Sequence, residues 1–153
     1  GLAIDTQLPA VADRSLEFAA ELIMLASTEP RDAYRQSNFD ARVKGGTAQD
    51  IVVYCLDELS LTLGQLLQAE MRGNRAGRSN AITRGIAILT ALEMGVDRET
   101  EMAESLVNFY EGARRLLLGS VAQTQVEAIK TLRADVIEIM EALKLVRSAP
   151  PSA

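Results

Sequence analysis

Apolar residues recur at steps of three and four along most of this 153-residue sequence. The clearest series is a set of leucines in a segment that starts at Thr47, and its members are Leu56, Leu59, Leu63, Leu66 and Leu67. A repeat of about 3.6 residues places such side chains on one face of an α-helix, and no segment alternates strictly as a half-buried strand would. Aromatic residues make up only 4% of the chain and Trp is absent. A core of Leu, Ile, Val, Ala and Met favours helices, so the sequence predicts an all-α fold.

Residues that begin or end helices divide the sequence after residue 46 into four segments. Thr47-Ala48-Gln49-Asp50 resembles a capping box, with Asp in place of the usual Glu or Gln. The predicted helices run from Thr47 to just before Gly73, from after Ser79 to Gly95, from Asp97 to Gly119, and from near Ser120 to just before Pro150. The short joints after the second and third helices predict antiparallel neighbours, and hence an up-down four-helix bundle.

The N-terminal part of the sequence predicts one additional helix. Residues 10–27 form an amphipathic pattern that ends at Thr28-Glu29-Pro30, and residues 31–46 are polar, as in a loop or a short helical turn over the bundle. We therefore expect an N-terminal extension over residues 1–30, a four-helix-bundle domain over residues 31–147, and a frayed tail over residues 148–153.

Composition argues against most enzymatic and nucleic-acid functions. The chain has no His, which removes the usual near-neutral acid/base group and the commonest metal ligand. Its single cysteine, Cys55, cannot form an intrachain disulfide, so the sequence is typical of a cytoplasmic protein. The net charge of −5 disfavours binding to nucleic acid, and no apolar run reaches the ~20 residues of a membrane span. We expect no catalytic residues and no cofactor.

The charged residues offer only weak candidates for a chemical site. Glu138 and Glu141 are helical neighbours that could bind a metal, but a helical di-metal site usually includes His ligands, so a solvated charged face is the favoured interpretation. The pair Arg114-Arg115 could contact a phosphate, yet such a pair more often complements the dipole at a helix end. A metal-dependent enzyme is therefore the least favoured reading.

Surplus apolar surface on the first of the four helices is a stronger candidate for a functional site than the charged residues are. Ile51, Tyr54 and Leu61 lie beyond the leucine series, and apolar surface of this kind can bind the apolar face of a partner helix. Leu and Ile series are usually core, so this pattern alone does not identify a partner.

Several short motifs occur in order between roughly residues 33 and 145: Ala33-Tyr34, the start of the first helix at Thr47, Leu56-Asp57, Ala81-Ile82-Thr83-Arg84 and Phe109-Tyr110. Their order and spacing resemble the FliS family of flagellin secretion chaperones. At the position of Leu56-Asp57 the family has an aromatic residue followed by an acid. This sequence departs from the family at Leu56, at Glu58 in place of Gly, and at Gly112 in place of Tyr.

The resemblance implies a cytoplasmic chaperone that binds the C-terminal segment of flagellin, prevents premature polymerisation and supports type III export, with export-apparatus components as possible further partners. The positions predicted to contact a partner combine the surplus apolar residues with positions of the family pattern. They are Tyr34, Ile51, Tyr54, Leu56, Asp57, Leu61, Ile82, Leu89, Phe109 and Tyr110. The alternative is a helical adaptor or regulatory bundle that binds another flagellar or export component.

The resemblance also suggests a role for the N-terminal extension. In the FliS family the N-terminal region is thought to cover part of the flagellin groove until flagellin displaces it. We therefore hypothesise that residues 10–34 pack against the bundle as an internal mimic of the ligand helix. The competing interpretation is an integral fifth helix of the core.

Overall fold

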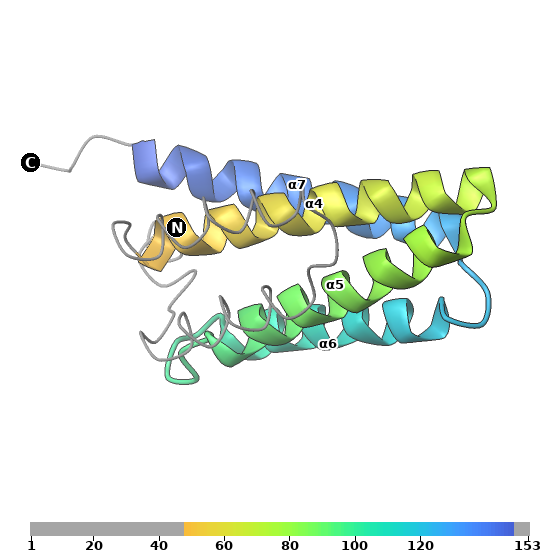
Figure 1. Ribbon diagram of the computed structural model, residues 1–153. Coiled ribbons are helices and arrows are strands. Elements are labelled where there is room, and N and C mark those ends of the chain that lie inside the picture. The colour runs from red at the N-terminus through yellow and green to blue at the C-terminus, as the bar shows by residue number, and fades with distance from the viewer. Residues whose placement is uncertain (1–47, 149–153) are drawn as a thin grey trace, which may run out of the picture.

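The computed structural model describes residues 48–148, which form four α-helices and contain no strand (Figure 1). The helices are α4 (Ala48–Arg72), α5 (Arg75–Met94), α6 (Ala103–Gly119) and α7 (Val126–Ser148). The predicted all-helical class with four helices is confirmed for this part of the chain. The predicted N-terminal helix, Tyr34 and residues 149–153 lie outside the described residues.

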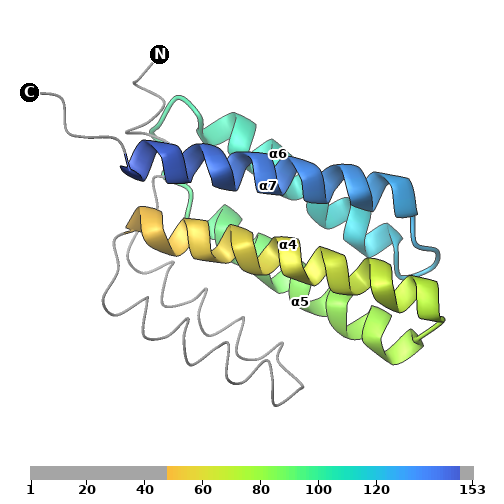
Figure 2. The same cartoon turned by 90° about the horizontal axis from the view of Figure 1, so that it is seen from above.

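The four helices form a bundle in which α4 is central. Helix α4 packs against both α5 and α7, and α6 packs against α5, whereas α6 and α7 contact each other only slightly. The packing order is therefore α6–α5–α4–α7, which Figures 1 and 2 show from two directions. The α4–α5 joint and the α6–α7 connection lie at one end of the bundle, and the α5–α6 connection lies at the other.

The leucine series of α4 forms the centre of the core. Leu56, Leu59, Leu63 and Leu66 are fully buried, and Leu67 is half-buried against them. The other helices contribute fully buried side chains of the same kind: Ile88 and Leu89 from α5, Leu117 from α6, and Ile129, Val136 and Leu143 from α7. Helical spacing in each segment thus directs one apolar face toward the core of the bundle.

Two features show that the outer helices α6 and α7 pack closely on their neighbours. Arg133 of α7 donates a hydrogen bond from Nε to the Ser60 carbonyl of α4, over 2.9 Å. On the other side of the bundle, a Cβ atom added to Gly85 of α5 would lie 2.7 Å from Cδ1 of Leu117 in α6. The missing side chain at Gly85 therefore allows α5 and α6 to pack together at this point.

The joint between α4 and α5 is shorter than the sequence pattern predicted. Gly73 adopts a left-handed conformation (φ 64°) that ends α4, and the Asn74 amide donates a hydrogen bond to the Ala69 carbonyl over 2.9 Å. The Asn74 side chain then caps α5 by accepting a hydrogen bond from the Gly77 amide. Helix α5 consequently begins at Arg75, so the predicted start after Ser79 was wrong by about one turn.

The third and fourth helices begin later than predicted. Asp97 heads a turn instead of capping a helix, because its carboxylate accepts a hydrogen bond from the Glu99 amide and its carbonyl accepts one from the Thr100 amide. Helix α6 starts only at Ala103. Helix α6 ends at Gly119, and the Ser120 amide and hydroxyl both donate to the Leu116 carbonyl of its last turn. Helix α7 does not start until Val126.

Candidate functional site

Helix α4 carries half of the residues predicted to contact a partner, and the structure separates them into two groups. Ile51 and Leu56 are buried in the core. Tyr54 and Asp57 are half-buried, and Leu61 is 42% exposed. Ile51, which the leucine series appeared to leave outside the core, is therefore enclosed, while Tyr54 and Leu61 keep accessible surface.

The accessible residues of α4 share one face of the helix. Tyr54, Asp57 and Leu61 are separated by three and four residues, so their side chains lie one above the other. Gln65 and Gln68 extend the same spacing with half-buried and exposed side chains. We call these five residues the accessible face of α4. A tyrosine and a leucine among polar residues give it the mixed character of a protein-binding surface.

The predicted site residues of α5 and α6 are mostly core residues. Ile82, Leu89 and Tyr110 are buried, and Phe109 is half-buried. The rings of Phe109 and Tyr110 meet edge to face, with centroids 5.9 Å apart and an interplanar angle of 65°. Phe109 belongs to α6, which packs mainly against α5, whereas the accessible face belongs to α4.

The core also contains an ion pair that the sequence pattern did not reveal. Nη2 of Arg84 in α5 lies 3.0 Å from Oε2 of Glu58 in α4, and both side chains are buried. The other two guanidinium nitrogens of Arg84, Nε and Nη1, have no hydrogen-bond partner. A buried charge is stable only when it is paired, so this contact joins α4 and α5 at a fixed register.

A signal for the pair was present in the sequence. Glu58 stands where the FliS pattern has Gly, and it is flanked by Leu56 and Leu59 of the leucine series. Arg84 belongs to the motif that carried the resemblance in the second helix. Only the packing of α4 on α5, however, shows that the two positions face each other.

Cys55 lies one turn before this ion pair along α4 and is also buried. Burial, together with the negative charge of Glu58, raises the pKa of its thiol from 9.0 to about 12. Burial and then the neighbouring Cys55 raise the pKa of the Tyr110 hydroxyl. The thiol is therefore protonated near neutral pH, and it lacks the thiolate character of a nucleophile.

Two of the other charged candidates, Arg114 and Glu141, form ion pairs within the bundle. Nη2 of Arg114 in α6 lies 3.2 Å from a carboxylate oxygen of Glu93 in α5, which ties the two helices together. Glu141 lies 3.6 Å from Lys144 on the surface of α7. Within residues 48–148, no three His, Cys, Asp or Glu side chains are grouped so that they could hold a metal ion.

Hydropathy gives one further observation. None of the helices described over residues 48–148 combines the length and apolar character that crossing a membrane requires.

Comparison with known proteins identifies a relationship over most of the chain. A family model described as flagellar protein FliS matches residues 30–149, a range that includes all four described helices. The match confirms the resemblance drawn from the motifs between residues 33 and 145. No curated protein and no solved structure matches the chain.

Proposed function

Since this chain belongs to the FliS family of flagellar export chaperones, we propose that it binds the C-terminal helical segment of flagellin in the cytoplasm. The observation that carries the proposal is the family match across residues 30–149, which spans the entire described bundle. Binding would keep flagellin monomeric until the type III export apparatus receives it.

The physical basis of this activity is the sequestration of an apolar helix face. A flagellin segment that becomes helical only when packed exposes apolar side chains as a free monomer, and these promote association. A chaperone that binds this segment reduces the concentration of polymerisation-competent monomer by mass action. The proposed function therefore needs no catalytic residue and no cofactor.

We propose that the accessible face of α4 contributes to the contact with flagellin. Tyr54, Asp57 and Leu61 offer two apolar anchors and one charge at helical spacing, which suits packing against the apolar face of another helix. Buried residues such as Ile51 and Leu56 would support the shape of this face from beneath. Phe109 would belong to a separate part of the contact, on α6.

A pair of matched leucine variants tests this surface. Leu61→Gln should weaken binding of a flagellin C-terminal peptide by about tenfold, because one apolar anchor of about 1.4 kcal/mol is lost. Leu145→Gln is the control, since Leu145 is 74% exposed and belongs to α7, not to the accessible face of α4. The melting temperatures of both variants should stay close to that of the parent protein, because neither leucine is a core residue. Equal affinity in the two variants would remove Leu61 from the contact.

The identity of the partner has its own test. The immobilised protein should retain flagellin from an extract of a flagellated host, and the free C-terminal peptide should compete for that binding. Retention of a different flagellar or export component, with flagellin absent from the bound fraction, would favour the adaptor function instead.

A further inference from the structure

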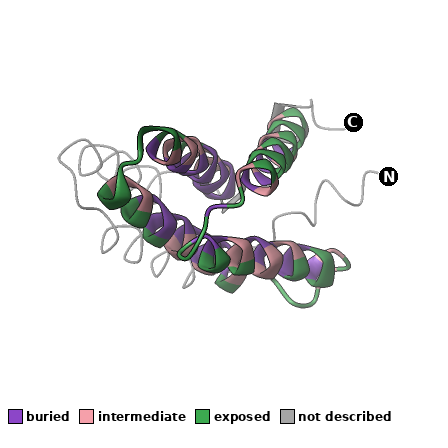
Figure 3. Cartoon of the chain, turned by 90° about the vertical axis from the view of Figure 1, so that its right-hand side faces the viewer, coloured by how far each residue is buried: buried purple, intermediate pink, exposed green. Residues whose placement is uncertain are grey.

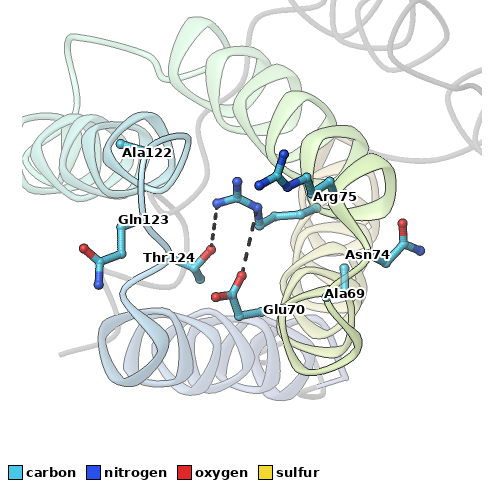
Figure 4. Close-up of a pocket in the computed structure, with 9 residues that line it drawn as sticks. Ala69, Glu70, Asn74, Arg75, Ala122, Gln123 and Thr124 are labelled. Atoms are coloured by element: carbon cyan, nitrogen blue, oxygen red, sulfur yellow. Dashed lines mark hydrogen bonds and ion pairs between the residues drawn. The ribbon is translucent and has the colours of Figure 1, made fainter.

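A polar pocket of about 270 Å³ lies at the end of the bundle where the α4–α5 joint faces the α6–α7 connection (Figure 4). Glu70 of α4, Asn74 and Arg75 at the start of α5, and Thr124 before α7 line its walls. Figure 3 looks onto this end of the bundle, where the connecting segments are mostly exposed. The pocket is thus formed by three separate parts of the chain.

Arg78 holds these parts together. Its Nη1 atom donates hydrogen bonds to the Ser120 carbonyl over 2.9 Å and to Oγ1 of Thr124 over 3.4 Å. Its Nε atom lies 4.0 Å from Oε2 of Glu70. The guanidinium of Arg78 therefore has a fixed position in the wall of the pocket, and binding a ligand there would need little reorganisation.

Arg75 differs from Arg78 because its charge is not used within the described structure. It lines the same pocket and is exposed, and its side chain has no hydrogen-bond or ion-pair partner among residues 48–148. A guanidinium presents several donors in a planar fork that matches a carboxylate. Arg75 is thus available to bind an anionic group that enters the pocket.

The charge at this end of the bundle is opposite to that of the whole protein. Arg72, Arg75 and Arg78 lie within two helical turns of the joint, and Glu70 is the acidic residue of the pocket. In the first turn of α7, Glu127 is offset by Lys130 at 3.5 Å. A protein with a net charge of −5 therefore presents a locally positive end.

Exposed apolar side chains lie beside the pocket on the α6–α7 side. Leu118, in the last turn of α6, is 54% exposed, and Val121, in the connection to α7, is 59% exposed. Val121 directly precedes the pocket-lining Ala122. Apolar residues beside a cationic pocket are typical of protein-binding surfaces.

We propose that this pocket binds an acidic side chain of a second protein, whose neighbouring apolar residues pack on Leu118 and Val121. A singly charged carboxylate fits better than a phosphate dianion, because the Glu70 carboxylate in the wall repels additional negative charge. The exposed apolar residues favour a protein segment over a free anion. This docking surface does not depend on the proposed contact between flagellin and the accessible face of α4.

The proposal can be tested with a defined peptide and two arginine variants. The probe is the peptide acetyl-Leu-Glu-Leu-Glu-Leu-amide, titrated into the full ¹⁵N-labelled chain, with its Gln-for-Glu counterpart as the control peptide. The acidic peptide should shift the amide resonances of Gly73, Asn74 and Thr124 saturably. Arg75→Gln should weaken this binding at least about tenfold. Arg98→Gln, which removes an exposed arginine in the connection at the opposite end of the bundle, should change it less than about twofold.

Three results would overturn the proposal. The first is equal binding of the Gln peptide, which would show that the carboxylate is not recognised. The second is an equal loss of affinity in the Arg75 and Arg98 variants, which would indicate a general charge effect. The third is saturation of the same resonances by inorganic phosphate with no response to the acidic peptide, which would make the pocket a site for small anions.

Discussion

Glu58 and Arg84 form the contact at which single-residue changes should matter most. Replacing Glu58 with Met leaves a guanidinium that is buried and cannot lose its proton, whereas replacing Arg84 with Met leaves a carboxyl group that can be protonated. We expect Glu58→Met to lower the free energy of unfolding by about 3–5 kcal/mol and Arg84→Met to lower it by less.

The double variant separates the charge effect from the packing effect. With both residues changed to Met, no uncompensated charge is buried, and the protein should regain most of the stability lost in Glu58→Met. Urea unfolding of the four proteins at neutral pH gives the coupling energy. Additive losses in the double variant would show that the two residues contribute independently.

Cys55 should make the stability of the protein decrease at alkaline pH. Because its folded-state pKa of about 12 exceeds the ordinary value of 9.0, the folded state holds the thiol proton more tightly than the unfolded state. The contribution of the Cys55 thiol to the free energy of unfolding is complete below pH 9. It is lost between pH 9 and about 12, by up to ~1.4 kcal/mol per pH unit. Cys55→Ala should reduce the decline between pH 9 and 10, as measured by urea unfolding. An unchanged slope in that variant would assign the decline to other groups, such as Tyr110.

For single residues, the sequence predicted the face of the helix on which a side chain lies better than it predicted how deeply that side chain is buried. Tyr54 and Leu61 were predicted to lie outside the core, and both keep accessible surface. Ile51 was grouped with them but is enclosed. Helical spacing around one helix assigns a residue to a face, but it cannot tell how many neighbouring helices cover that face.

At the scale of elements, local capping explains why the predicted helix bounds differed from the structure. Gly77 and Ser79 weaken the helical pattern at the start of α5, and the prediction therefore placed the start after them. The Asn74 cap stabilises a helix start by about 1 kcal/mol, which is enough to offset the cost of Gly77. Asp97, by contrast, uses its carboxylate in a turn, so the helix that was predicted to begin at Asp97 begins only at Ala103.

Two glycine variants test how closely α5 and α6 pack. Changing a helical glycine to alanine normally adds about 1 kcal/mol of stability. At Gly112 of α6 the nearest atom to an added Cβ is 3.8 Å away, so Gly112→Ala should show this gain. At Gly85 the new Cβ would lie 2.7 Å from the fully buried Leu117, and overpacking should remove the gain and cost about 1–3 kcal/mol.

Thermal or urea unfolding of the two glycine variants measures the difference directly. Gly85→Ala is expected to be the less stable of the two by at least about 1 kcal/mol. If both variants were stabilised to the same extent, Leu117 would have moved aside without cost, and α5 and α6 would not be tightly packed at this point.

At the scale of the whole molecule, the central position of α4 accounts for its unusual apolar content. A helix with one packed neighbour needs one apolar face, but α4 packs against both α5 and α7. Ile51, one of the three residues that lie beyond the leucine series, is buried within the bundle, whereas Tyr54 and Leu61 keep accessible surface. The all-helical class could be predicted because every segment had helical spacing, whereas the packing order α6–α5–α4–α7 depends on contacts between distant segments.

Calorimetric titration with a peptide of the flagellin C-terminal helical segment measures whether this protein binds flagellin. We expect saturable one-to-one binding with a dissociation constant of about 1 μM or tighter, and a negative heat-capacity change between two temperatures, because apolar surface is buried. A peptide of the same composition in scrambled order is the control, since scrambling removes the apolar helix face. The absence of saturable binding at both temperatures, or equal binding of the scrambled peptide, would contradict the proposed function.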